Sequence, residues 1–205
     1  MLPPGTVAFV SERRERHSRL TAFFRWLLVI PHLVYVAVYG FVAFFGGIVA
    51  WLALVVTGRY PEGLYRFMAG YARVASRVNA YAYLLDDRFP PFAADDASSY
   101  PSELRIGPPK TSYSRLLAFF RWALLIPVWL ITYVLSVLVG ILAFVGWVVV
   151  IVLGRMPEGL HNAIAFCVSY LARGVAYGCL LTEDFPGFDG SVEAAEARAA
   201  ARHDR

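Results

Sequence analysis

Arginine supplies almost all of the positive charge of this chain, and its positions suggest the first candidate chemistry. Eighteen of the nineteen cationic residues are arginine, and only Lys110 is lysine. A guanidinium group binds phosphate through two parallel hydrogen bonds, whereas lysine acts as a point charge. We therefore expect these arginines to bind anionic lipid headgroups or a membrane-protein partner. A GC-rich genome would raise the arginine content in the same way.

The candidate binding residues all flank long uncharged segments of the chain. They are Arg25, Arg59, Glu62, Arg66, Arg73, Arg77, Tyr81, Arg121, Arg155, Glu158, Arg173 and Tyr177. Arg66, Arg73 and Arg77 are seven and four residues apart, which places them in one stripe along a helix. Phenylalanine, tyrosine and valine occupy the opposite side, so the helix predicted here is amphipathic and suits a membrane interface.

The remaining polar residues form no catalytic grouping. The four histidines lack metal-ligand spacing, and no phosphate loop or nucleophile elbow occurs in the sequence. We interpret His32 as an interfacial histidine, and Asp86-Asp87 and Glu183-Asp184 as solvated helix ends. Cys167 and Cys179 are expected to be reduced and packed. The prediction is a non-enzymatic protein without metal or cofactor; a lipid-directed enzyme using these polar groups is a third alternative.

The positions of these residues follow from an internal repeat with an offset of 96 residues. Of the 74 aligned positions from residue 19 to residue 92, 29 are identical in the second copy. The duplication divides the chain into five parts. These are a basic leader (1–18), repeat A (19–92), a polar linker (93–112), repeat B (113–188) and a polar tail (189–205).

Each repeat contains one long segment without acidic or basic residues, 26–58 in repeat A and 122–154 in repeat B. Hydrophobic residues make up 59% of the chain and charged residues 17%, against about 25% charged in typical soluble domains. A soluble helix of this length would need a polar face, and neither segment has one. The sequence therefore predicts an all-α integral membrane protein with about four transmembrane crossings and interfacial arginine-striped helices.

Two layouts fit this pattern. In the first, each uncharged segment is a hairpin of two short spans, turning at Gly46-Gly47 in repeat A, and the striped helix lies along the interface. In the second, each segment is one long tilted span, and the striped helix returns across the bilayer. We favour the hairpin because burying Arg73 and Arg77 at mid-membrane costs roughly 2.5–3.5 kcal/mol for each. Both layouts contain an even number of spans per repeat, which predicts parallel repeats.

The distribution of charge predicts the orientation. Residues beside the uncharged segments carry a net charge of +9, whereas the linker and the tail together carry −5. Cationic flanks stay in the cytoplasm. We therefore expect a multi-pass protein of the cytoplasmic membrane with its N-terminus, linker and C-terminus in the cytoplasm. The same distribution argues against nucleic-acid binding.

The conserved motifs of the two copies also resemble a known family. They are Phe24-Arg25-Trp26-Leu27-Leu28-Val29-Ile30-Pro31-His32, Gly58-Arg59-Tyr60-Pro61-Glu62-Gly63-Leu64, Arg73, Arg77, Ala80-Tyr81 and Phe89-Pro90-Pro91-Phe92. This set resembles the domain of unknown function 4389 family. The resemblance implies a bacterial, mainly actinobacterial, inner-membrane protein without an established activity. Repeat B has Val128, Ser169 and Gly187 where repeat A has the histidine, the first arginine of the pair and one proline.

Two functions remain open at this point. The first is a structural, lipid-headgroup-binding or accessory role in the membrane, alone, as a homo-oligomer or with a membrane-protein partner. The second is a small transporter or channel at the interface between repeats or between copies. Polar residues of the uncharged segments, such as Tyr35, Tyr39, Thr132 and Ser136, would line such a pathway.

Overall fold

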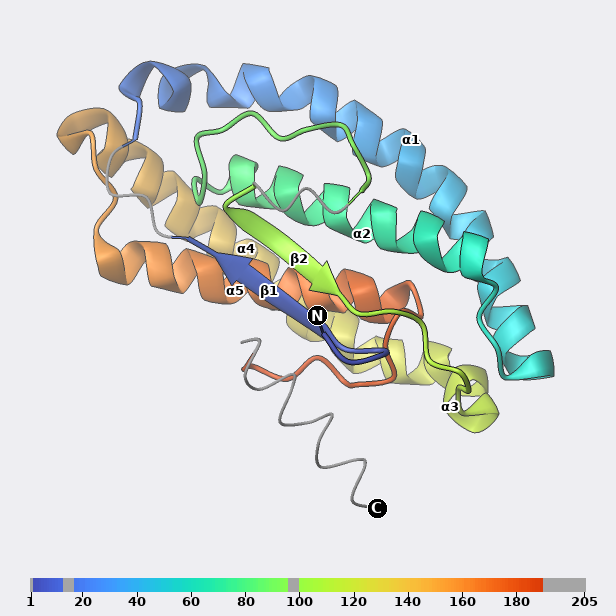
Figure 1. The fold of residues 1–205 in the computed structure, drawn as a ribbon. Helices are drawn as coiled ribbons and strands as arrows, with labels where there is room; N and C mark the ends of the chain where they lie inside the picture. The colour runs from blue at the N-terminus through green and yellow to red at the C-terminus, as the bar shows by residue number, and fades with distance from the viewer. Residues whose placement is uncertain (1, 13–16, 96–99, 190–205) are drawn as a thin grey trace.

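A computed structural model of the chain describes residues 2–12, 17–95 and 100–189, and this part is mostly helical (Figure 1). The elements in chain order are β1 (Val7–Ser11), α1 (Arg19–Thr57), α2 (Glu62–Ala82), β2 (Ser102–Ile106), α3 (Arg115–Phe119), α4 (Arg121–Leu153) and α5 (Glu158–Gly178). The predicted tail, apart from residue 189, lies outside the described residues.

Each uncharged segment forms one long helix, so the hairpin layout is wrong. α1 continues through Pro31 and Gly46-Gly47 and ends at Gly58, whose φ of 68° is left-handed. α4 likewise ends at Gly154, with a φ of 70°. Helices tolerate an internal glycine at roughly 1 kcal/mol relative to alanine. A Cβ at Gly46 would lie 3.3 Å from Leu64 of α2, so this glycine lets two helices approach and does not form a turn.

The Gly-Arg-x-Pro-Glu-Gly motif connects the long helix of each repeat to the shorter one. α1 ends before Gly58 and α2 begins at Glu62, with Pro61 as its N-cap. Pro157 has the same position before α5. A proline there loses no hydrogen bond, because the first N–H groups of a helix have no partner within it. The interpretation of this motif as a helix–turn–helix connector is confirmed.

The two repeats are antiparallel and are related by a pseudo-twofold axis. The Trp51 indole donates a hydrogen bond to the carbonyl of Ala118 (2.9 Å), and the Trp147 indole donates one to the carbonyl of Ala22 (3.0 Å). Both pairs of positions differ by 96 residues. Each contact thus occurs twice, with the roles of the two repeats exchanged, as at an isologous interface between identical subunits.

Backbone hydrogen bonds at the ends of the long helices show the same twofold relation. The backbone N–H of Tyr113, before α3, donates to the carbonyl of Gly58 (2.8 Å), and that of His17, before α1, donates to Gly154 (3.2 Å). The start of each long helix therefore lies beside the end of the other. The helices of the two repeats run antiparallel because the linker carries the chain back along the molecule before repeat B begins (Figure 1). The predicted parallel relation concerns orientation toward the membrane, which a pseudo-twofold axis along the membrane normal would satisfy, and it stays a prediction.

Part of that return path is a β-strand, which corrects the all-α assignment. β1 from the leader and β2 from the linker pair in antiparallel register, with Phe9 opposite Leu104. β1 packs on α5 and β2 packs on α2. Two five-residue strands in polar segments give only a weak sequence signal, since strand preference depends on the surface that the strand covers.

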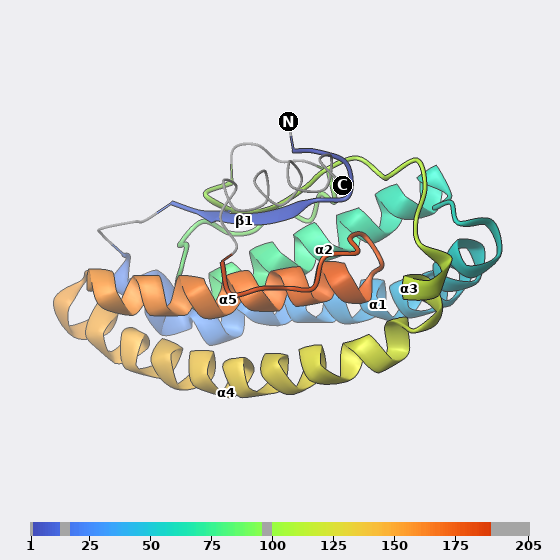
Figure 2. The ribbon, with the colours of Figure 1, turned by 90° about the horizontal axis from the view of Figure 1, so that it is seen from below.

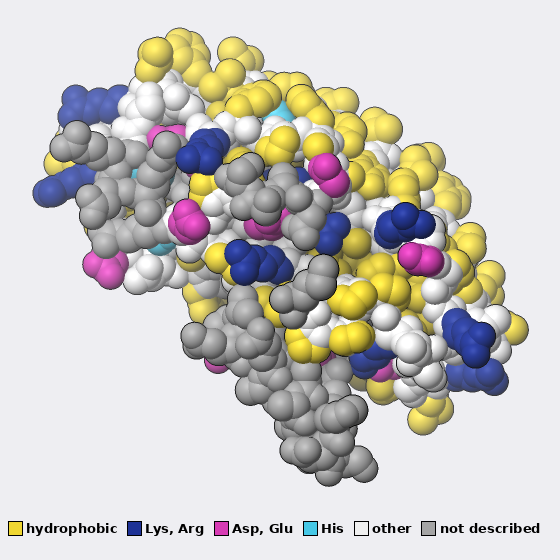
Figure 3. Space-filling model, viewed as in Figure 1, with side chains coloured by type: hydrophobic (Ala, Val, Ile, Leu, Met, Phe, Trp, Pro, Cys, Tyr) yellow, Lys and Arg dark blue, Asp and Glu magenta, His cyan; other side chains and the backbone are white. Residues whose placement is uncertain are grey.

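The helices and strands form layers of different polarity. Figure 2 shows β1 above α5, and α4 below it. Among the described residues, all but six of the exposed large hydrophobic side chains lie on α1, α3 and α4; the others are Phe120, which joins α3 to α4, and Phe89, Phe92, Phe166, Phe185 and Phe188. Acidic and basic side chains are spread over the face that carries the strands, and hydrophobic side chains gather along the α1 edge (Figure 3).

The long helices are therefore poor candidates for the core of a soluble protein. In the most apolar 18-residue stretch of α1, only 17% is buried inside the protein. In the corresponding stretch of α4 the share is 28%. Both helices are long and apolar enough to span a membrane. An exposed apolar surface of this extent marks an interaction site. The core lies between these helices and α2 and α5, and it extends to Phe9 and Leu104 of the strands.

Candidate functional site

The leading arginine of repeat A lies in a buried cluster at the start of α1. Arg25 is only 2% exposed, although six residues earlier Arg19 opens the same helix at the surface. Its Nη1 donates to the carbonyls of Tyr81 and Asp86, and its Nη2 donates to the carboxylate of Asp87. The guanidinium carbon lies 4.6 Å from the centre of the Tyr81 ring. We call this group the Arg25 cluster.

Asp87 completes the Arg25 cluster as its anion. Nδ1 of His17 lies 3.1 Å from one carboxylate oxygen, and the backbone N–H of Ser18 donates to the other (2.8 Å). Burial opposes ionisation, but the hydrogen bond and the charge of His17, the Ser18 N–H and Arg25 together hold the pKa of Asp87 below its usual value. The expectation of a solvated helix end is wrong here, and Asp86 is buried as well.

The equivalent arginine of repeat B has a different set of partners. Arg121 is 4% exposed, its guanidinium carbon lies 4.0 Å from the centre of the Tyr177 ring, and its Nη2 donates to the carbonyl of Thr182 (3.0 Å). Its Nε and Nη1 make no hydrogen bond to any group in the described ranges of the chain. Glu183, the counterpart of Asp87, instead accepts hydrogen bonds from Nζ of Lys110 (2.6 Å) and from the backbone of Ser114 (2.6 Å).

The second retained arginine of each repeat fixes a loop against its helix. Arg77 is fully buried, and its Nη2 donates to Glu103 of β2 (2.6 Å), while its other bonds go to the carbonyls of Ala93 and Asp95. Arg173 donates to the carbonyls of Gly187 and of the neighbouring residue 189. Both arginines thus hold the segment that follows the Phe-Pro motif.

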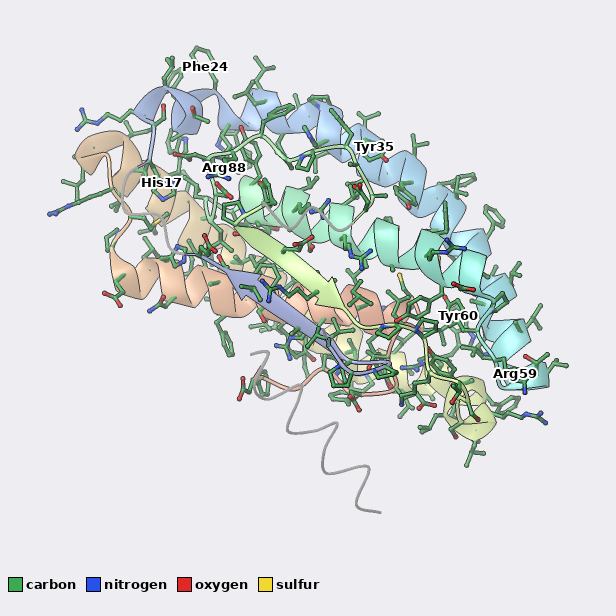
Figure 4. All side chains as sticks on the ribbon, viewed as in Figure 1. His17, Phe24, Tyr35, Arg59, Tyr60 and Arg88 are labelled. Atoms are coloured by element: carbon green, nitrogen blue, oxygen red, sulfur yellow. The ribbon has the colours of Figure 1, made fainter. Side chains whose placement is uncertain are left out.

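The predicted candidates separate into buried and exposed groups. The buried ones are Arg25, Arg77, Tyr81, Arg121, Arg173 and Tyr177, and Arg73 is half-buried. The exposed ones are Arg59, Glu62, Arg66, Arg155 and Glu158. The predicted stripe does occupy one side of α2, but this side faces β2 at Arg77 and is open to solvent at Arg66. Figure 4 shows Arg59 and Tyr60 at one end of α1, and His17 and Arg88 at the other.

His32 is a packed residue of the interior. Its ring is fully buried, stacks on Phe92 at 4.3 Å and meets Phe89 edge-on. Its Nε2 lies 2.7 Å from the carbonyl of Pro90. The histidine thus holds the Phe-Pro segment of repeat A against α1. Among the described residues, no three His, Cys, Asp or Glu side chains are placed to hold a metal ion.

Sequence reasoning missed the contacts between Arg25 and Tyr81 and between Arg121 and Tyr177. The signal was available, since both residues of each pair recur at the offset of 96 with an acid at position 87 or 183. The two cysteines were predicted correctly, because Cys167 and Cys179 are buried free thiols. Burial raises the pKa of the Cys179 thiol to about 12, so this group stays protonated.

Comparison with known proteins identifies the family. The model of the Domain of unknown function (DUF4389) matches residues 19–94 and again residues 115–189. The matches cover most of the chain and coincide with the two repeats, so the chain belongs to this family and carries its domain twice. The resemblance inferred from the motifs is confirmed. A search of curated proteins and a search of solved structures found no match.

Proposed function

We propose that this member of the DUF4389 family is a non-enzymatic protein of the cytoplasmic membrane that lies flat in one leaflet. In this arrangement α1, α3 and α4 enter the acyl region, and the strands face the cytoplasm. The supporting observation is the concentration of exposed apolar side chains on these three helices along their whole length. A protein that crossed the bilayer would expose them in a belt around its middle instead.

The length of the long helices supports the flat arrangement. The uncharged part of α1 runs from Trp26 to Thr57 and is about 48 Å long at 1.5 Å per residue. The hydrocarbon core of a bilayer is only about 30 Å thick. A crossing helix would need a tilt of roughly 50° to stay within it, whereas tilts of about 0–40° are usual.

The path of the linker gives an independent argument. Because the repeats are antiparallel, a crossing arrangement would require β2 and its flanking loops to traverse the bilayer between α2 and α3. β2 carries the exposed Arg105, and within the part of the chain that the structure describes it pairs with β1 alone. Irregular backbone and open strand edges do not occur in contact with lipid, because their polar groups would lack partners. The flat arrangement keeps the leader and the linker on one side, as the charge distribution predicts.

Exposed arginines at both ends of the molecule would then contact lipid headgroups. Arg59 and Arg115 lie at the turn after α1, and Arg155 and Arg19 lie at the turn after α4. Each can extend from the apolar layer into the phosphate region, with its aliphatic part among the acyl chains. The proposed role is therefore structural or accessory, through binding of anionic headgroups by these two ends.

Labelling of the two turns tests the arrangement directly. Arg59→Cys and Arg155→Cys would be made in a background in which the buried Cys167 and Cys179 are alanine, with Arg105→Cys on β2 as reference for the strand face. We expect a membrane-impermeant maleimide to label all three positions from the cytoplasmic side only. Labelling of Arg59→Cys and Arg155→Cys from opposite sides would refute the flat arrangement. It would favour the alternative function, a small transporter or channel.

Liposome flotation tests the headgroup contacts. We expect retention on vesicles with anionic lipid to exceed retention on phosphatidylcholine vesicles. Arg59→Gln with Arg155→Gln should reduce this difference, since each cationic residue near an anionic surface contributes about 1 kcal/mol. Arg105→Gln, on the opposite face, serves as the matched control. Equal losses for the control and the double variant would contradict specific contact by the turns.

A further inference from the structure

We propose that the cavity between the two repeats binds a single-chain lipid with an anionic oxyanion head, and that Arg121 holds the head. Fatty acids and lysophospholipids have this chemistry. The proposal rests on the proposed function, because such a ligand would enter from the bilayer. It adds a specific binding site to a protein whose surface contacts with lipid would otherwise be general.

The cavity has the size and the lining of a ligand site. Its volume is about 400 Å³, within the range of roughly 300–1,000 Å³ for small-molecule pockets. Phe44 of α1 and Trp122 and Trp129 of α4 stand at its rim, and each is about half exposed on the apolar layer. Met68 of α2 and Cys179 after α5 form its buried floor. The opening therefore faces the acyl region in the flat arrangement.

Four glycines create much of this space. The cavity is lined by Gly40, Gly47, Gly174 and Gly178. The equivalent positions of the other repeat all carry side chains: Ser136, Ala143, Val78 and Ala82. At all four of these positions, the repeat that lines the cavity has a glycine where the other repeat has a side chain.

Helix packing does not account for all of these glycines. A Cβ at Gly47 would lie 3.7 Å from Met68, and one at Gly178 would lie 3.9 Å from Leu125. Both distances are ordinary van der Waals contacts. Glycine within a helix costs about 1 kcal/mol relative to alanine. Two of the four lining glycines are therefore not required by close contacts, and they leave empty volume in the cavity.

Arg121 supplies the anion-binding group at one end of the cavity. It belongs to the lining, it is 96% buried, and its Nε and Nη1 have no hydrogen-bond partner in the described part of the chain. A buried guanidinium is costly unless its charge is compensated. In repeat A the carboxylate of Asp87 bonds the arginine directly. In repeat B the Tyr177 side chain and the charge of Glu183 favour the charged form of Arg121, but the Glu183 oxygens accept their hydrogen bonds from Lys110 and Ser114. An oxyanion in the cavity would take the place that Asp87 occupies in repeat A.

A second unpartnered polar atom indicates the extent of the ligand. The Thr132 hydroxyl also lines the cavity and makes no hydrogen bond among the described residues. It follows Arg121 by eleven residues, or about 16 Å along the helix. Between them the lining of α4 is apolar. A free phosphate ion would satisfy Arg121 alone, whereas an acyl chain would also fill the apolar volume, so we assign the site to a lipid.

Tryptophan quenching by brominated lipid tests the site. Trp51, Trp122 and Trp129 line the cavity, so bromine atoms on a bound chain should quench their fluorescence. The protein would be placed in phosphatidylcholine nanodiscs and titrated with dibromostearic acid or with its uncharged methyl ester. We expect saturable quenching by the acid that stearic acid reverses and that inorganic phosphate does not reverse.

Variants distinguish binding of the lipid head group from binding of its acyl chain. Arg121→Gln should weaken binding of the acid about tenfold or more, as expected for loss of charge-assisted hydrogen bonds, and leave the methyl ester unchanged. Gly178→Leu should abolish saturable quenching by both probes. Gly140→Leu is the matched control, because Gly140 is exposed on α4 with open space around it. If Arg121→Gln does not fold, Arg121→Lys and Gly178→Leu provide the same comparison.

Two outcomes would overturn the proposal. One is quenching that rises without saturation and equally in all variants, which indicates partition into the bilayer only. The other is displacement of the probe by phosphate alone. The labelling of Arg59→Cys and Arg155→Cys is independent of these readouts. Labelling from opposite sides with intact saturable quenching would refute the flat arrangement and retain the lipid site.

Discussion

Repeat A neutralises its leading arginine with a carboxylate, whereas repeat B leaves the equivalent arginine beside a cavity. Arg25 is bonded to Asp87, and Arg121 stacks on Tyr177 while Glu183 bonds to Lys110. The two copies share their helical arrangement and the exchanged indole contacts across the pseudo-twofold axis, although the helix equivalent to α1 is interrupted at Phe120 in repeat B. The two copies thus share a scaffold but differ in the partners of this buried arginine, and also at other buried positions such as His32, which is Val128 in repeat B. In repeat A the arginine is compensated within the protein, whereas in repeat B the ligand proposed above would supply that compensation.

The largest effect is expected at the ion pair that attaches β2 to repeat A. Glu103→Gln leaves the fully buried Arg77 without its carboxylate. Breaking a buried pair from one side typically costs about 3–5 kcal/mol. We expect a loss of this size in the free energy of unfolding, measured by denaturant titration in micelles. Arg105→Gln, the exposed neighbour on the same strand, should change it by less than about 0.5 kcal/mol.

A double-mutant cycle would sharpen this result. Arg77→Met combined with Glu103→Leu removes both charges, so the double variant should lose less stability than the sum of the single variants. Additive losses would show that the two side chains act independently, against the structure.

The next largest effect on the free energy of unfolding is expected at Asp87, and it should exceed the effect at its counterpart Glu183. Asp87→Asn should lower the free energy of unfolding at pH 7 by about 2 kcal/mol, since it removes charged hydrogen bonds to Arg25 and His17. Glu183→Gln should cost about 1 kcal/mol or less, because its pair with Lys110 is partly solvated, with side chains 14% and 19% exposed. Equal costs would contradict the distinction between the repeats.

The pH dependence of stability follows from the same carboxylate. The pKa of Asp87 is lowered in the folded protein, so its contribution is present above the unfolded value of about 3.9 and is lost as pH falls through the folded pKa. Asp87→Asn should therefore flatten the acid limb of the stability curve below about pH 4. Unfolding would be followed by tryptophan fluorescence from pH 7 to pH 2.5. An unchanged acid limb would exclude Asp87 as its source.

The pseudo-twofold axis itself predicts matched effects. Trp51→Phe and Trp147→Phe each remove one hydrogen bond between the repeats, worth roughly 1 kcal/mol. The two contacts lie at opposite ends of the helix pair, so their costs should be similar and should add in the double variant. Unfolding in micelles would measure both. A cost confined to one tryptophan would show that the two halves of the interface are not equivalent.

The sequence predicted the repeat, the connector and the family, because these depend on local patterns and identities. It did not predict how the two copies pack. Gly46-Gly47 looked like a turn, since a glycine pair cannot be distinguished from a close helix contact without its neighbour. The antiparallel packing depends on the path of the linker back along the molecule, and the pairing of β2 with β1 is a contact between residues some 95 positions apart.

The candidate site was only half predictable for a related reason. Arginine beside an uncharged segment was expected at the headgroups, and the exposed Arg59 and Arg155 have positions that suit this. Arg25 and Arg77 are instead satisfied by Asp87 and Glu103, acids that lie 62 and 26 residues further along the chain. One-dimensional spacing shows which face of a helix an arginine occupies, but not whether a distant carboxylate covers that face.

The smallest effect on stability is expected where the two repeats are most alike, at the exposed turns. Arg59→Gln and Arg155→Gln should each change the free energy of unfolding by less than about 0.5 kcal/mol, as for other exposed charges. In the flat arrangement both turns touch the same leaflet, so the two variants should lose retention on anionic vesicles by equal amounts. A crossing protein would bring only one turn to the outer surface of a vesicle after one-sided insertion. Unequal losses in flotation would therefore separate the two ends and argue against a shared leaflet.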